Sequence, residues 1–390
     1  MSKITLGIIF GGKSVEHDVS IITACQVIEA VDKRRYNIAP IYITKGGEWF
    51  SGEKLAHIET FKRNKFRDEK QAFLSPLPSF KALMPYPEGP KLFQRKNIMP
   101  EIDVAIPLVH GTNGEDGTLQ GLLELADIPY VGSGVQASAI GMDKIAMKSI
   151  FSDCDLPVVD HLWFYSKKWR NRPENKIARI EESLGYPVIV KPANLGSSIG
   201  ISLVDNRDKL MYAVDIASRY DRRIMVESAV ENLVEINCAV LGVSAELQSS
   251  LCEQPTARKE VLSFNDKYLS GNKGGRNRKP TSQIPADLPH RTEKLIQSMA
   301  QAAFSAIDAR GTARVDLLMN KETDQVYINE INTIPGSLSM NLWEKSGVKP
   351  AQLIDRLVFM AINTHKEKNK LMYAYKSNLL TVSKIKKTDK

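Results

Sequence analysis

The chain has 390 residues, of which 43% are hydrophobic and 25% charged, and its formal net charge is +8. This composition is that of an ordinary soluble globular protein, and no run approaches the ~20 apolar residues that a helical membrane span needs. The length exceeds that of one typical domain, so two or three domains are expected.

Residues 4–10 form an apolar run directly after the start of the chain, and no small-residue cleavage site follows it, so we expect no signal peptide and a cytoplasmic protein. The cysteines, at 25, 154, 238 and 252, lack metal-type spacing and are expected to be reduced and buried. Basic residues are interleaved with acidic ones, which favours a solvated basic surface over a nucleic-acid interface. Two local basic clusters are exceptions, residues 273–279 and the tail 366–390.

The N-terminal third alternates predicted strands and helices. Residues 4–10 are a predicted buried strand, apolar residues at helical spacing follow around position 25, and residues 37–44 are the next predicted strand. Another apolar run, 104–109, ends at His110. This βαβ pattern predicts an open parallel sheet, whose ligands bind beyond the carboxyl ends of the strands.

The middle of the chain has a predicted helix around 144–151 and then two β-rich runs separated by a Gly/Ser loop, residues 186–204. We expect an antiparallel hairpin whose loop offers backbone N–H groups to phosphate oxygens, with Lys191 entering it as a point charge. Taken alone, this loop fits an ordinary flexible turn better. It is neither a Walker motif nor a dinucleotide fingerprint.

A second hairpin is predicted from residues 313–319 and 326–331. Glu330 and Asn332 alternate with an apolar residue and therefore face one side, and the turn brings Asp316 beside them. Oxygen ligands of this kind suit Mg²⁺. The alternative is a solvated face of an amphipathic hairpin. Residues 263–285 are a long polar, Gly-rich loop, of a kind that is usually functional or disordered.

Together these motifs resemble the ATP-grasp superfamily and, within it, the D-alanine–D-alanine ligase family. The similarity covers about residues 4–365. It rests on ordered motifs at 11–20 (GGKSVEHDVS), 110–117 (HGTNGEDG), 141–144 (GMDK), 191–200 (KPANLGSSIG), 267–270 (KYLS), 314–316 (RVD) and 329–336 (NEINTIPG).

The resemblance implies an α/β chain with an ATP-grasp fold preceded by an N-terminal open parallel-sheet domain. Three domains are expected, with boundaries at 1–140 for the N-terminal domain, 141–228 for the central ATP-grasp subdomain and 229–365 for the C-terminal catalytic domain, followed by the basic tail 366–390. A homodimer is expected from the family only.

The resemblance also implies nucleotide contacts. Lys144 and Lys191 match the lysines that hold ATP phosphates, and Ser198 lies in the phosphate loop. Glu227 and Glu235 match the acids at adenine and ribose, although the spacing between these two differs by about one residue from family relatives.

By the same resemblance, two Mg²⁺ ions, for which Mn²⁺ is an expected substitute, are bridged by Glu330, with Asp316 on one and Asn332 on the other. The family joins two D-alanines, for peptidoglycan precursors, through a D-alanyl phosphate. Arg314 and the N–H of Gly336 match the donors to the oxyanion that forms when the second amine attacks.

For the first D-alanine, the resemblance assigns Glu16 to the ammonium group and His110 to the same pocket, and it assigns Ser197 and Tyr268 to closing the long loop. The alternative for Glu16 is a first-turn helix acid favoured by the macrodipole. For Tyr268 it is a surface aromatic residue, and for His110 a satisfied histidine at a strand end.

The segment after Gly336 is shorter than in the family and lacks the family's serine position for the second carboxylate. Ser339 is the preferred substitute and Ser337 the next. The alternatives for function are therefore a ligase that takes another D-amino acid, such as D-serine, as second substrate, or a non-catalytic nucleotide-binding relative.

Overall fold

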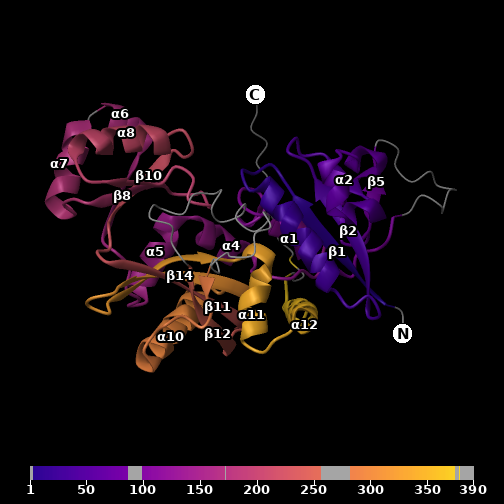
Figure 1. The fold of residues 1–390 in the computed structure, drawn as a ribbon. Coiled ribbons are helices and arrows are strands. Elements are labelled where there is room, and N and C mark those ends of the chain that lie inside the picture. The colour runs from indigo at the N-terminus through magenta and orange to yellow at the C-terminus, as the bar shows by residue number, and fades with distance from the viewer. Residues whose placement is uncertain (1–2, 87–98, 172, 256–281, 374–376, 378–390) are drawn as a thin grey trace.

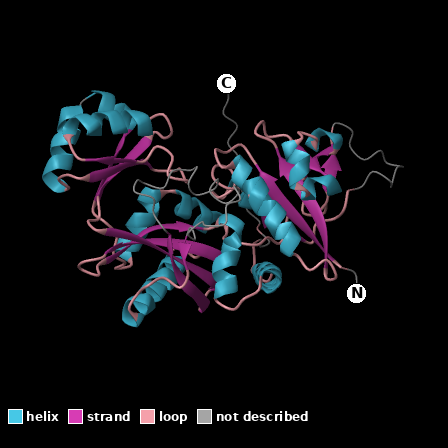
Figure 2. Ribbon diagram, in the orientation of Figure 1, coloured by secondary structure: helices cyan, strands magenta, loops and turns pink. Residues whose placement is uncertain are grey.

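Three β-sheets organise the chain. The computed structural model describes residues 3–86, 99–171, 173–255, 282–373 and 377. Figure 1 shows the first sheet on the right, the second at the upper left and the third below, and Figure 2 shows helices packed against all three. Within the described ranges, no helix is both long and apolar enough to cross a bilayer.

The first sheet has the order β5-β4-β3-β2-β1-β6. Strands β1 (Ile4–Gly11), β2 (Tyr36–Ile43) and β6 (Val104–Pro107) are parallel, as the sequence predicts. Three further strands extend it with antiparallel pairing: β3 (Trp49–Ser51), β4 (Lys70–Leu74) and β5 (Leu83–Pro85). The prediction did not include these short strands, which lack a continuous apolar run.

Strand β1 is buried on both faces, as expected for a strand inside a parallel sheet. Ile8 packs in one core with helix α1 (His17–Ala30), and Ile9 packs in another with helix α3 (Thr118–Leu125). Shorter elements complete this region: η1 (Glu53–Ala56), α2 (Ile58–Lys62) and η2 (Phe66–Asp68).

The second sheet is antiparallel, in the order β7-β10-β8-β9. Its strands are β7 (His161–Tyr165), β8 (Val188–Pro192), β9 (Ser202–Val204) and β10 (Arg223–Ser228). The predicted hairpin is confirmed as β8 and β9. Alternate residues such as Val190 and Val226 pack under α6 (Ser166–Asn171), α7 (Pro173–Ser183) and α8 (Arg207–Ala217), so Lys191 and Glu227 face the other side.

The third sheet is also antiparallel, in the order β13-β12-β11-β14-β15. Its strands are β11 (Leu233–Val243), β12 (Glu246–Pro255), β13 (Ser282–Gln283), β14 (Gly311–Asn320) and β15 (Val326–Asn332). Val315 and Ile331 pack against Phe304 of helix α10 (His290–Ala306), which leaves their sequence neighbours on the opposite face.

Helix α5 (Lys144–Asp153), which the sequence predicts, connects the second and third sheets. Its Ile145 packs against Ala193 and Met225 of the second sheet region, whereas Met147 and Phe151 pack in the core of the third. Helix α4 (Val135–Met142) precedes it. Polar side chains on α5 are therefore held between two sheets.

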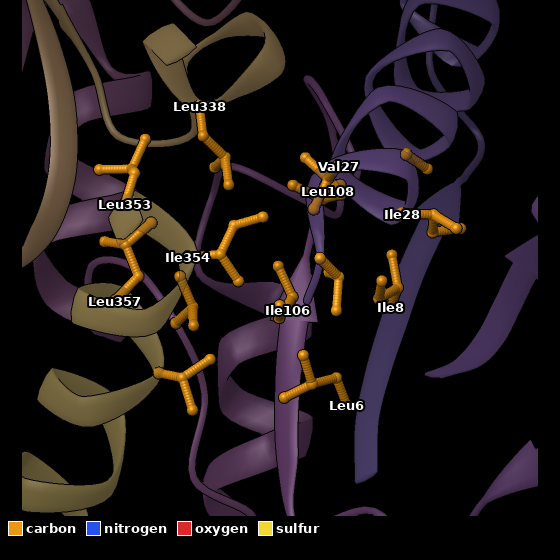
Figure 3. Packing of buried hydrophobic residues seen from close by; sticks show 14 of the residues in the cluster. Leu6, Ile8, Val27, Ile28, Ile106, Leu108, Leu338, Leu353, Ile354 and Leu357 are labelled. Atoms are coloured by element: carbon orange, nitrogen blue, oxygen red, sulfur yellow. The ribbon is translucent and has the colours of Figure 1, made fainter. Parts of the chain in front are cut away.

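The C-terminal elements pack back onto the first sheet. After β15 come the turn η4 (Gly336–Ser339), α11 (Met340–Lys345) and α12 (Pro350–Lys368). Figure 3 shows Leu338, Ile354 and Leu357 facing Ile106 and Leu108, and all five belong to one buried cluster. This packing places η4 beside α1, so residues at opposite ends of the sequence meet.

Candidate active site

The β14–β15 hairpin carries the predicted carboxylates on one face. Asp316 and Glu330 are register partners, and Arg314 lies opposite Asn332. The Arg314 guanidinium donates to both carboxylate oxygens of Asp316, with Nε at 2.6 Å and Nη2 at 2.7 Å, and Asn332 Nδ2 donates to Asp316 Oδ2 at 3.0 Å. The prediction that these side chains share one face of the hairpin is confirmed. The Asp316 carboxylate is neutralised by a bidentate ion pair with the Arg314 guanidinium.

A β-bulge interrupts this hairpin next to the acids. Asp316 pairs with Glu330 but Leu317 pairs with Ile328, so Asn329 is an extra residue on β15. Bulges of this kind turn side chains out of the regular alternation. Asn329 Oδ1 accepts a hydrogen bond from Lys191 Nζ at 3.3 Å, which connects the third sheet to the second. Asn329 was not predicted as a site residue, because strict alternation assigns it to the core face.

Lys144, the first residue of α5, lies between the sheets. Asp143 caps the helix by accepting from the N–H groups of residues 145 and 146, and it forms an ion pair with Arg223 on β10. Lys144 Nζ lies 2.9 Å from Glu330 Oε2 and donates to the carbonyl of Leu195 at 2.9 Å. Burial lowers the pKa of Lys144, but the charge and hydrogen bond of Glu330 and the charges of Glu227 and Glu16 together outweigh it, so the pKa is raised and the ammonium form is favoured.

Three buried charged side chains, Lys148, Lys191 and Glu227, lie next to the second sheet. The carboxylate of Glu227 pairs with Lys191 through Oε1 and with Lys148 through Oε2, the latter at 3.3 Å. Burial raises the pKa of Glu227, but the charges of Lys148 and then Lys191 outweigh it and hold the pKa below its usual value. Lys148 was not predicted, although its position four residues after Lys144, on the same helix face, is a signal that identifies it.

Replacing Glu227 with glutamine is expected to destabilise the protein by ~3–5 kcal/mol, because Lys148 and Lys191 lose their shared buried counter-charge. Urea denaturation followed by circular dichroism measures this. Glu246→Gln, at an exposed position on β12, is the matched control and should change stability by less than ~0.5 kcal/mol. A loss below ~1 kcal/mol for Glu227→Gln would mean that the two lysines are not held by this carboxylate.

Glu16 lies at the N-cap position of α1, but its side chain makes no capping bond. Its Oε1 accepts a hydrogen bond from the Ser197 hydroxyl, so the first sheet region meets the β8–β9 loop. The carboxylate passes close to two glycines, since a Cβ at Gly111 or Gly196 would come within 3.0 Å of Oε2. Burial raises the pKa of Glu16, the charge of Glu115 adds to this, and the Ser197 bond opposes it.

His110 follows β6 and is buried. Its Nδ1 lies 3.6 Å from Glu115 Oε1, and its Nε2 is 3.1 Å from the hydroxyl of Thr23. Burial lowers the pKa of His110, but the hydrogen bond and charge of Glu115 outweigh it, and the pKa is raised. The structure therefore brings His110 into the same electrostatic cluster as Glu16.

The turn after β15 has left-handed backbone at Ser337, Leu338 and Ser339, with φ between 50° and 53°. Such conformations in non-glycine residues are strained and collect at functional sites. Burial of Leu338, together with the hydrogen bonds of Ser337 to Thr23 and Gln26, holds the turn. Ser339 is buried.

The remaining predicted residues are placed as follows. Ser198 is left-handed like Ser197, with φ of 56° at both. Glu235 is exposed on β11, two residues before Asn237, and Asn237 pairs with Asp316. Glu235 therefore lies on the same face of the third sheet as Asp316.

The space around Gly336 is open, since a Cβ built there would meet nothing within 4 Å. Tyr268 and the basic cluster 273–279 lie outside the described residues.

The site thus combines three cations, Lys144, Lys191 and Arg314, with acids from all three sheet regions. Such an arrangement can hold a polyphosphate and a small zwitterion together. The three-sheet α/β fold and this cluster define an ATP-grasp enzyme class.

Comparison with known proteins gives the family. The family model "D-ala D-ala ligase N-terminus" matches residues 5–133, and "D-ala D-ala ligase C-terminus" matches residues 150–359. The chain belongs to the D-alanine–D-alanine ligase family. The predicted resemblance and fold class are confirmed.

Similar proteins cover nearly the whole chain. A D-alanine–D-alanine ligase of Bacillus cytotoxicus is 40% identical over 380 residues, 96% of this chain and 99% of its own. A solved D-alanine–D-alanine ligase from Coxiella burnetii is 30% identical, with a TM-score of 0.80, over 95% of this chain and 97% of that one. A D-Ala:D-Ser ligase from Enterococcus faecalis is also 30% identical, with a TM-score of 0.76, over 92% and 100%.

Proposed function

We propose that this chain joins two D-alanines into D-alanyl-D-alanine at the expense of ATP, through a D-alanyl phosphate, for peptidoglycan precursors. The observation that carries the proposal is the Glu16–Ser197 contact beside the lysines and acids of α5 and the β14–β15 hairpin. This contact supports a site in which a carboxylate for the ammonium group lies next to lysines for the phosphates. Activation of a carboxylate by phosphoryl transfer needs these two parts together.

We assign the nucleotide to residues of helix α5 and of the second and third sheets. Lys144 and Lys191 hold the phosphates as point charges, helped by the N–H groups of the loop that contains Ser198. Glu227 lies at the adenine edge and Glu235 at the ribose. The family uses ATP, which supports this assignment.

The donor set also fits divalent metal ions. Asp316 and Glu330 are register partners, and the amide Nδ2 of Asn332 donates to Asp316 Oδ2 at 3.0 Å, so three oxygen-bearing side chains share one face of the hairpin. We assign two Mg²⁺ ions, or Mn²⁺, to these residues. When bound, the ions neutralise charge on the phosphates.

For the first step, Glu16 holds the ammonium group of one D-alanine, with Ser197 and His110 fixing the pocket. The carboxylate of this D-alanine attacks the γ-phosphorus, the bond to the β–γ bridging oxygen breaks, and ADP leaves. In the second step, the amine of another D-alanine attacks the acyl carbonyl and phosphate leaves. Arg314 and the N–H of Gly336 receive the developing oxyanion.

The second carboxylate is assigned to Ser339, because the Ser337 hydroxyl donates to Gln26. Ser339→Ala should raise the second-site KM for D-alanine more than about tenfold, since a hydrogen bond to a charged group contributes ~1.5–3 kcal/mol. Initial rates at varied D-alanine measure this. Ser337→Ala shares the left-handed backbone, with φ of 50° against 53°, and serves as the control. An unchanged KM for Ser339→Ala would assign the carboxylate to Ser337, if Ser337→Ala raises the KM, or otherwise to a backbone donor.

A product-resolved assay tests the function itself. ADP release that depends on D-alanine, with D-alanyl-D-alanine as the product, supports the proposal. Preference for D-serine as second substrate would support the alternative specificity, consistent with the shortened segment after Gly336. If ADP release does not depend on D-amino acids, or if no ADP is released, the protein does not catalyse this reaction and is a nucleotide-binding relative of the ligases.

We also propose a cytoplasmic homodimer of three-domain subunits, divided at about residues 140, 228 and 365. The family supports the dimer. The domain boundaries are supported by the position of each sheet in the sequence. Sedimentation equilibrium at the mass of one 43.5 kDa chain would refute the dimer.

A further inference from the structure

Lys148 is a buried lysine that the roles above leave unused. It lies on the first turns of α5, and its side chain is 0% exposed. Burying an ammonium group is costly unless a counter-charge is at hand. Its ion-pair partner among the described residues is Glu227, the acid assigned to the adenine edge.

The carboxylate of Glu227 is held from two sides. Lys191 pairs with Oε1 and is itself engaged by Asn329. Lys148 lies 3.3 Å from Oε2. With a contact at each oxygen, the plane of the carboxylate is fixed, whereas one contact alone would leave it free to rotate.

Two atoms of this pair keep unused hydrogen-bonding capacity. Among the described residues, neither Lys148 Nζ nor Glu227 Oε2 has a hydrogen-bond partner, and both atoms are buried. Their 3.3 Å contact supplies the counter-charge for the carboxylate. A carboxylate oxygen has two lone pairs, so Oε2 can accept from a ligand while it stays beside Lys148.

An acceptor fixed at this place discriminates between purines. Adenine carries an amino donor at the position where guanine carries a carbonyl acceptor. An ionised carboxylate accepts from the adenine amino group and repels the guanine oxygen. Lys148 keeps Glu227 ionised and oriented, so its effect reaches the base through Glu227.

We infer that Lys148 is a positioning residue for nucleotide selection, which fixes the Glu227 carboxylate for the adenine amino group and thereby favours ATP over GTP. The inference rests on the proposed role of Glu227. It predicts a defect in base recognition rather than a general loss of structure.

Lys148→Met is the direct test, because it keeps the side chain as far as Cε and removes the charge. Glu227 remains paired with Lys191, so no buried charge loses its last partner. Calorimetric binding of ADP and of GDP, without D-alanine, is the primary measurement. Steady-state rates with ATP and GTP are the second.

The ratio of ADP to GDP affinity should fall at least about tenfold in Lys148→Met, and the KM for ATP should rise by a similar factor. The kcat at saturating ATP and the KM for D-alanine should stay within about twofold. Lys209→Met, an exposed lysine of α8, is the matched control and should leave the ratio unchanged.

An unchanged ADP to GDP ratio in Lys148→Met would overturn the inference, as would a wild-type protein that binds both equally. If Lys148→Met does not fold, Lys148→Met/Glu227→Gln removes one charge of each sign and takes its place. A wild-type ratio in that double variant would also overturn it, because base selection would then not depend on the Glu227 carboxylate that Lys148 positions. Failure of the wild type to form the dipeptide would refute the proposed function instead.

Discussion

Glu330→Gln and Asp316→Asn are each expected to abolish most ATP turnover, by about 100- to 1,000-fold, while the protein stays folded. Both changes remove a charge and keep the shape of the side chain. Several kcal/mol of transition-state charge stabilisation depend on the metal that these acids are assigned to hold, and each ~1.4 kcal/mol is a factor of ten in rate. Mg²⁺-dependent release of ADP in the presence of D-alanine measures the loss.

The same hairpin offers matched controls. Glu322→Gln and Asp324→Asn change exposed acids in the turn between β14 and β15 and should keep wild-type turnover. Circular dichroism and the thermal midpoint check that all four variants are folded. Turnover near the wild-type rate in both Glu330→Gln and Asp316→Asn would refute the metal assignment.

The position of these acids was predictable because strand alternation determines which residues share a face. Glu330, Asn332 and Asp316 lie where that pattern puts them. Alternation fails at Asn329, because a bulge adds one residue to β15 and sends two successive side chains away from the core. A bulge depends on the pairing of two strands, so one strand's pattern does not show it.

Long-range packing sets the features that sequence patterns missed. Lys148 becomes a buried charge only because α5 lies between two sheets, and the family match did not include it. The left-handed turn at Ser337 is tolerated because α12 brings Leu338 into a core shared with the first sheet. The parallel strands were predictable from continuous apolar runs, whereas the three short antiparallel strands were not.

The contact between Glu16 and Ser197 shows how a local interpretation and a long-range one compete. In sequence, Glu16 suits the first turn of a helix, where the macrodipole favours an acid. In the structure its side chain makes no capping bond and instead reaches a loop 181 residues away. The local explanation therefore does not account for its buried position.

Arg314→Lys is expected to slow dipeptide formation by about 100- to 1,000-fold, the usual effect of losing one oxyanion donor. Arginine can donate through a planar fork to Asp316, at 2.6 Å and 2.7 Å, and still direct other N–H groups at a substrate oxygen. Lysine keeps the charge, but its three N–H donors share one nitrogen atom and form no planar fork. It cannot hold Asp316 at both oxygens and also reach the developing oxyanion.

The ratio of ADP released to dipeptide formed identifies the step affected. Because Arg314 is assigned to the second step, the acyl phosphate should still form in Arg314→Lys and then be lost to water, so the ratio should rise well above that of the wild type. Arg207→Lys, at an exposed ion pair on α8, is the control and should leave both rates unchanged. If ADP release and dipeptide formation fall together with the ratio unchanged, Arg314 acts in the first step, through Asp316, and its assignment to the oxyanion is wrong.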